Sequence, residues 1–103
     1  MYKLCVFIPE SHLQKVKDAM FSAGAGKIGN YDHCCWQTHG QGQFRPLPDS
    51  QPHIGTIGEI EFIDEVKVEL VVSNEQIKTV IESMKLAHPY EEPAYDAWQL
   101  AEL

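Results

Sequence analysis

The sequence predicts one α+β domain of the ferredoxin-like kind, with the element order β-α-β-β-α-β. Two strand-like segments, 2–8 and 60–72, are each followed by a segment with apolar residues at helical spacing. The chain has 103 residues, the usual length of a single domain. With right-handed crossovers, this order gives a four-stranded antiparallel sheet with both helices on one face.

The first half begins with a strand over residues 2–8, which ends at Pro9. Apolar residues occur at both its even-numbered and its odd-numbered positions, as in a strand covered on both faces. Glu10 or Ser11 is placed to cap the helix that follows. That helix has an apolar stripe and ends at Gly24, a natural C-terminal cap. The stripe is Leu13, Val16, Met20 and Ala23.

The glycines of segment 24–29 match the pattern G-x-G-x-x-G. A dinucleotide site needs this pattern after a strand and at the start of a helix, whereas here it follows a helix. We therefore interpret it as a turn. Residues 33–39 are rich in β-formers and predict the second strand, and 40–53 predict a long loop with a short strand near Phe44.

The second half begins with apolar and charged residues in alternation over 60–72, with a bend or bulge expected at 63–65, where Asp64 interrupts the apolar set. Asn74 is the expected cap of the second helix, and Pro89 ends that helix at His88. The helical stripe is Ile77, Val80, Ile81 and Met84. A last strand is expected over 94–100.

Composition limits the classes of partner. Fifteen acidic residues against eight basic ones give a net charge of −7, which argues against nucleic acid and anionic membrane. Three cysteines, two of them adjacent, do not predict a disulfide scaffold. The sequence begins without a basic leader and has no apolar run of about 18 residues, so a cytoplasmic location is expected.

Segment 86–96 brings ionisable side chains of several kinds close together in the sequence. It holds a histidine, two tyrosines and three carboxylates between and around Pro89 and Pro93. The prolines fix two φ angles and so hold the polar side chains at defined angles. A segment that only packs rarely needs so many polar groups, which makes it the first candidate for a site.

Three motifs carry a family resemblance: 29–46, 54–58 and His88-Pro-Tyr-Glu-Glu-Pro-Ala-Tyr-Asp96. They resemble the inserted domain of Nif-three-like proteins, also called GTP cyclohydrolase type-two homologs, and the resemblance covers nearly the whole chain. It implies a fold of the PII and CutA kind and an assembly, most simply a trimer, with ligand or metal sites in clefts between subunits. The apolar residues on both parities of the strands agree, because a bare sheet face would then pack against another subunit.

The resemblance also limits the expected activity. Full-length Nif-three-like proteins carry a dinuclear metal site in a flanking domain, and its ligands have no matching positions in this sequence. The chain is therefore expected to be a non-enzymatic module that binds a small molecule or a cation and assembles with copies of itself. A partner protein is a further candidate. A CutA-like protein that binds a divalent metal is the alternative, and a hydrolase with Glu92 as general base is the least favoured hypothesis.

The candidate site residues are polar and aromatic side chains on or beside loops. For the ligand cleft they are His39, Arg45, His53, His88, Tyr90 and Glu91, and for a metal they are His88 and Glu91. Histidine and carboxylate together suit zinc or another divalent metal, but no pair has a specific short spacing. The alternative is that these histidines hydrogen-bond the backbone and stiffen loops. No cofactor is specified by the sequence beyond this possible metal ion.

Two further groups have alternative interpretations. Tyr90, Tyr95 and Trp98 could form a stacking platform for a planar ligand or, more commonly, fill the sheet face and an interface. Cys34 and Cys35 point to opposite faces of a predicted strand, and at least one of them is expected to be a buried apolar residue.

Overall fold

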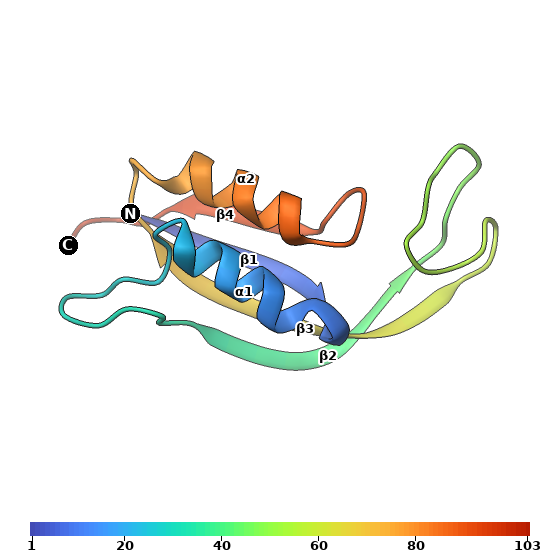
Figure 1. Ribbon diagram of the computed structural model, residues 1–103, viewed down its shortest axis with the longest axis horizontal. Helices are drawn as coiled ribbons and strands as arrows, with labels where there is room; N and C mark the ends of the chain where they lie inside the picture. Colours follow the sequence, from blue (N-terminus) through green and yellow to red (C-terminus); the bar gives the residue numbers. More distant parts are fainter.

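The computed structural model describes residues 1–103 and contains a four-stranded antiparallel sheet with two helices on one face (Figure 1). The elements in chain order are β1 (Tyr2–Pro9), the 3-10 turn η1 (Glu10–His12), α1 (Leu13–Ser22), β2 (Trp36–Phe44), β3 (Glu61–Val72), α2 (Ile77–Ala87) and β4 (Tyr95–Gln99). The strand order is β2-β3-β1-β4, and all neighbours are antiparallel. The predicted fold class is confirmed.

The core lies between the helices and one face of the two central strands. Alternate residues of each central strand are buried, as period-two patterning requires, and each helix buries the stripe that faces them. The largest fully buried side chains include Leu4, Val6, Ile8, Val16, Met20, Val66, Val68, Val72, Val80 and Met84. Neither helix has the length and apolar character that a membrane span would require.

The ends of the helices are predicted better than their beginnings. Gly24 follows α1 with a φ of +109°, and His88 follows α2 in extended conformation, as a residue before proline should. The expected caps are wrong, because no side chain caps either helix and Gln76 takes the N-cap position of α2. Asn74 instead accepts hydrogen bonds from the Met1 nitrogen at 2.6 Å and from Gln99 Nε2 at 3.2 Å.

The second strand is later and longer than predicted. Residues 33–35 are not strand, and His33 has a φ of +54°. The strand instead continues through the glycines to Phe44, because β3 provides a long partner. The register runs without interruption from Trp36 opposite Glu69 to Phe44 opposite Glu61, so no bulge is present at 63–65.

The interruption at Asp64 has another cause. Phe62 and Asp64 are both exposed, although they are even-numbered like the buried residues of β3 and so lie on the same face of the strand. The β2–β3 hairpin extends beyond the helices, as Figure 1 shows, so nothing covers these two side chains. The domain is accordingly elongated, with extents of 46 × 25 × 24 Å.

The sheet face opposite the helices carries both apolar and charged side chains. Cys5, only 3% exposed, lies in β1 on this face, and burial raises the pKa of its thiol. On the β3 row, Lys67 Nζ lies 3.9 Å from Glu69 Oε1. The remaining large apolar residues are Phe7, Trp36, Phe44, Ile63, Val71 and Trp98. The expectation that another subunit covers this face stays a prediction.

The two ends of the chain meet at one end of the sheet. Leu100 donates its backbone N–H to the Met1 carbonyl oxygen at 2.9 Å. Figure 1 shows both termini at one end of the molecule and the β2–β3 loop at the other.

Candidate functional site

The candidate site lies where two loops meet, the β2–β3 connection (45–60) and the α2–β4 connection (88–94). Glu91 joins them, because its Oε1 accepts a hydrogen bond of 2.9 Å from the Gln51 backbone N–H. Residues 40 positions apart in the sequence are thereby brought together, at the end of the molecule away from the termini.

His88 links the α2–β4 connection to strand β1 of the sheet through a hydrogen bond. Its ring is only 6% exposed, and its Nε2 lies 2.8 Å from the Phe7 carbonyl oxygen. Its Nδ1 accepts the Tyr90 backbone N–H at 3.2 Å. Because a carbonyl can only accept, Nε2 carries the proton and the ring is neutral. Burial lowers the pKa of His88, and the nearby His12 and His53 lower it further, while the Phe7 carbonyl partly opposes the shift.

Tyr90 turns its ring into the space between the loops. The ring centroid lies 5.0 Å from that of His88, 6.0 Å from Phe44 and 6.5 Å from His53. The hydroxyl is buried and has no hydrogen-bond partner in the chain. Burial raises the pKa of the Tyr90 hydroxyl strongly, and the Glu65 carboxylate contributes to the increase. A buried polar group without a well-formed hydrogen bond costs free energy. A ligand that hydrogen-bonds the Tyr90 hydroxyl would remove this cost.

Glu65 reaches the same space from the sheet. It is half-buried on the open face of β3, and its carboxylate lies over Gly42 of β2. A Cβ atom at position 42 would collide with this carboxylate. The glycine therefore leaves the room that the Glu65 side chain occupies.

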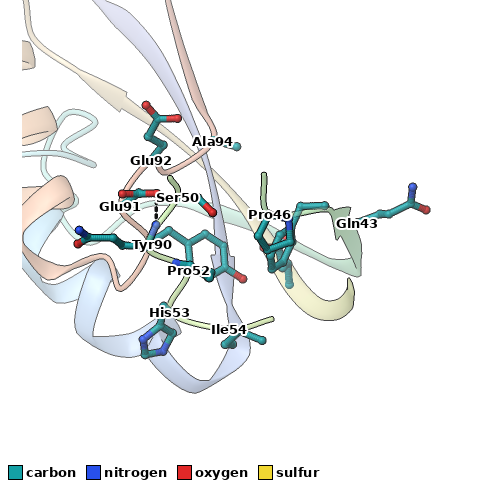
Figure 2. Close-up of a pocket in the computed structure, with 13 residues that line it drawn as sticks. Gln43, Pro46, Ser50, Pro52, His53, Ile54, Tyr90, Glu91, Glu92 and Ala94 are labelled. Carbon is teal, nitrogen blue, oxygen red and sulfur yellow. Dashed lines mark hydrogen bonds between the residues drawn. The ribbon is translucent and has the colours of Figure 1, made fainter. Parts of the chain in front are cut away.

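Together these residues surround a cavity of about 250 Å³ (Figure 2). Figure 2 shows Tyr90 at its centre, with Pro52, His53 and Ile54 from the first loop on one side and Glu91 from the second loop on another. A largely apolar wall surface with a few convergent polar groups is typical of small-molecule sites. Such an arrangement can hold and orient a small ligand.

The structure brings together only part of the predicted residue set. His53, Tyr90 and Glu91 line the cavity, and His88 supports it from beneath through its contact with the Tyr90 ring. His39 lies elsewhere, on the helix side of β2, where its Nδ1 is 3.1 Å from Glu10 Oε1. Arg45 is exposed, does not line the cavity and pairs with no carboxylate of this chain.

The hydrogen bonds of His88 conflict with its predicted role as a metal ligand. Both ring nitrogens of His88 are used in hydrogen bonds, so a metal at His88 would have to displace one of them. No group of three histidine, cysteine, aspartate or glutamate residues is arranged to hold a metal ion. The histidine of segment 86–96 thus acts here as a structural support.

The suggested aromatic platform does not form. Tyr95 packs against the core below Lys85, whose Nζ lies 5.2 Å from the ring centroid, whereas Trp98 lies on the open sheet face. Tyr90 faces the cavity, away from both. Of the adjacent cysteines, Cys35 packs partly against the core, and Cys34 donates a weak hydrogen bond to the Asp32 carbonyl.

Three residues of the site were missed. Glu65 belongs to the charged, odd-numbered positions of β3, which suggest a solvated stripe. Phe44 was assigned to a long loop with a short strand near it and was not considered for the site. His12 forms an edge contact with His53 at a centroid distance of 5.5 Å. The pairing of β2 with β3 could have indicated Glu65, because it places glycines opposite and beside this residue.

Sheet order and helix placement define the class of this protein as a ferredoxin-like α+β domain of the kind found in CutA. The periplasmic divalent cation tolerance protein CutA from Archaeoglobus fulgidus matches with a TM-score of 0.69 over 99% of this chain and 86% of that chain. The sequence identity is 15%, so the likeness establishes the fold alone.

The sequence itself is closer to proteins related to NIF3. A Bacillus cereus protein related to NIF3 has a TM-score of 0.83 and 39% identity, over 98% of this chain and 26% of that chain. The GTP cyclohydrolase 1 type 2 homolog of Halalkalibacterium halodurans is 46% identical over 101 residues, which are 98% of this chain and 27% of the relative. No protein-family model matches the chain.

This chain is therefore a homologue of one segment of the NIF3-related proteins, and the resemblance predicted from its three motifs is confirmed. It spans about a quarter of the length of these relatives.

Proposed function

We propose that the chain is a non-enzymatic binding or regulatory module, whose ligand occupies the cavity between the two loops. The observation that carries the proposal is the buried Tyr90 hydroxyl, which faces the cavity without any partner. The fold is that of CutA, and the chain matches only a segment of the relatives called cyclohydrolase homologs. Their name therefore supplies no activity for this segment.

The module works as a homo-oligomer in this proposal, most simply as a trimer. The open sheet face supports self-association, because it exposes Trp36 and Trp98 to 69% and 46%. Large exposed apolar side chains on one face are typical of a surface that another chain covers. A cytoplasmic location is part of the same proposal.

A divalent metal is a second candidate for the ligand, and His12 and His53 favour it because their rings are in contact at the rim of the cavity. Two imidazoles make an incomplete site for zinc, which takes four ligands. A metal would therefore need Glu91 or a residue from another copy.

Native mass spectrometry of untagged protein tests the proposal, because one spectrum reports subunit number and bound mass. We expect an oligomer that carries a stoichiometric small molecule or ion. The cavity variant Ala94→Trp should lose that mass, whereas the control Ala101→Trp, in the exposed C-terminal segment, should retain it. A monomer without bound mass, unchanged by added divalent metals or small molecules, would contradict the proposal.

A further inference from the structure

The cavity is acidic. Glu65, Glu91 and Glu92 line it, and no lysine or arginine does. Phosphate and carboxylate ligands are recognised in proteins mainly by arginine, lysine and backbone N–H groups. The sign of the charge in this cavity therefore disfavours an anionic ligand and favours a cationic one.

Glu65 is the half-buried carboxylate of the cavity, and it has no cationic partner. It forms no ion pair in the chain, and the polar side chain that its carboxylate affects is the Tyr90 hydroxyl. Its neighbours across the sheet are Pro9 and Gly40, and neither has a polar side chain. Glu69, four residues along the same strand and face, has Lys67 beside it. A half-buried charge that lacks a partner is costly, so Glu65 gains most from a cation.

The Tyr90 hydroxyl adds the second polar contact. Burial and the neighbouring Glu65 carboxylate raise the pKa of this hydroxyl, and no atom of the chain completes a well-formed hydrogen bond with it. A ligand N–H can donate to either oxygen, and a ligand with two N–H groups can satisfy both. The rings of Phe44 and Tyr90 stand beside these groups and can stabilise a positive charge through their π faces.

The volume of the cavity restricts the class of ligand further. The volume of about 250 Å³ lies below the range of about 300–1,000 Å³ that is usual for drug-sized ligands. A nucleotide is therefore too large as well as wrongly charged for this cavity. A bare metal ion is also disfavoured here, because the exposed surface of the walls is largely apolar and no three metal ligands converge.

We propose that the cavity binds a small organic cation with a primary ammonium group and a short apolar arm. The ammonium donates hydrogen bonds to the Glu65 carboxylate and the Tyr90 hydroxyl, and the arm packs against Phe44. This proposal rests on the proposed binding function and specifies the chemistry of its ligand. A quaternary ammonium is excluded by the same geometry, since it has no N–H to donate.

Calorimetric titration of the full chain with probes of matched shape tests the proposal. The probes are butylammonium and benzylammonium as cations, benzyl alcohol as the neutral analogue, benzoate as the anion and benzyltrimethylammonium as the quaternary cation. We expect a primary ammonium to bind at least about tenfold more tightly than the alcohol, because hydrogen bonds to charged groups contribute about 1.5–3 kcal/mol. Benzoate and the quaternary ion should bind more weakly than the primary ammonium.

Variants locate the binding. Glu65→Gln should weaken ammonium binding about tenfold or more, and Tyr90→Phe, which removes only the hydroxyl, should weaken it several-fold. The matched control Glu69→Gln lies on the same strand and face outside the cavity and should leave it unchanged. Thermal melting of each variant without ligand confirms that it is folded.

The outcomes separate this proposal from the broader one. If benzyl alcohol or benzoate binds as tightly as the ammonium and Ala94→Trp abolishes that binding, the cavity is a site but the cationic ligand is wrong. If Glu65→Gln binds the ammonium as the wild type does, the assigned contact is wrong. If no probe binds even at millimolar concentration and the purified protein carries no bound mass, both proposals fail.

Discussion

The two crossover connections of this fold hold their positions by different means. The first connection, residues 23–35 after α1, is held in place by backbone hydrogen bonds. The Gly26 N–H donates to the Val71 carbonyl at 2.8 Å, and the Cys34 N–H donates to the Gly26 carbonyl at 2.9 Å. The second, which follows α2, is fixed by a side chain, since His88 bonds both Phe7 and Tyr90. The second connection lines the cavity described above, and no residue of the first does.

This difference has a chemical consequence. The turn at Gly26 satisfies its polar groups within the backbone and contributes no side chain to the cavity. A turn made of proline, histidine and tyrosine brings ring nitrogens and a hydroxyl with it, and one of these, the Tyr90 hydroxyl, remains unsatisfied. We therefore expect that damage to the first connection affects stability alone, whereas damage to the second affects stability and ligand binding together.

The largest effect is expected for His88→Ala. The change removes a buried ring and leaves the Phe7 carbonyl and the Tyr90 N–H without their partner. Each unsatisfied buried group costs about 1–3 kcal/mol, so the free energy of unfolding should fall by about 3–4 kcal/mol. Urea denaturation measures this, with the exposed His33→Ala as control. A loss below about 1 kcal/mol would show that the ring does not hold the loop.

Gly26→Ala should have the next largest effect. Gly26 has a φ of +78°, and a Cβ there would lie 2.7 Å from the Cys34 carbonyl oxygen. The left-handed conformation costs roughly 1–2 kcal/mol for alanine, and the collision adds to this. We expect a total loss of about 2–3 kcal/mol in urea denaturation, with ammonium binding unchanged in the folded fraction.

Gly29→Ala is the matched control, because its φ of +56° is similar but its Cβ would have open space. It should cost only the conformational part, about 1–2 kcal/mol. Equal losses at the two positions would show that the close approach to Cys34 contributes nothing.

The second connection should also depend on pH, unlike the first. Burial lowers the pKa of His88 below the ordinary value of 6.5, so the unfolded chain takes up a proton at a higher pH than the folded one. The stability from neutral His88 is present above pH 6.5 and is lost as the pH falls below it, by up to about 1.4 kcal/mol per pH unit.

Chemical denaturation at a series of pH values between 7.5 and 5 tests this, compared with His88→Gln and His33→Gln. The first variant should lose part of the slope, and the second should retain it. A wild-type stability that is flat across this range would contradict a lowered pKa at His88.

The smallest effect on stability is expected for Gly42→Ala, which nevertheless should change binding. The new methyl group collides with the end of the flexible Glu65 side chain, which can move away at little cost. The matched variant is Gly40→Ala, on the same strand and face but with open space at its Cβ. Both should fold with stability within about 1 kcal/mol of the wild type.

Only Gly42→Ala should weaken ammonium binding in calorimetry, because it displaces Glu65 from the cavity. Weakening by both variants would indicate a general effect of alanine in β2. Weakening by neither would remove Glu65 from the proposed site.

The features that could be predicted from the sequence are those fixed by local patterns. The alternation in β3, the stripes of α1 and α2 and the end of α2 before Pro89 each follow from a few neighbouring residues. The family resemblance and the fold were confirmed as well. The candidate segment 88–91 was found because its prolines and polar residues are adjacent in the sequence.

The features that were missed depend on residues far apart. The glycines at 40 and 42 indicate a loop locally, but a long partner strand pairs with them. His39 and His53 both appear beside the same loop, yet the strand register turns His39 to the helix side and away from the cavity. Glu65 enters the site only because glycine stands beside it across the sheet.

The joined ends of the chain have an architectural consequence. Because Met1 and Leu100 are hydrogen-bonded to each other, a polypeptide can enter and leave this domain at nearly one point. Such a unit can be inserted into a surface loop of a host domain without stretching it. Its cavity would then project from the host, since it lies at the far end of a 46 Å body. The matched segments in relatives about four times as long are compatible with this arrangement.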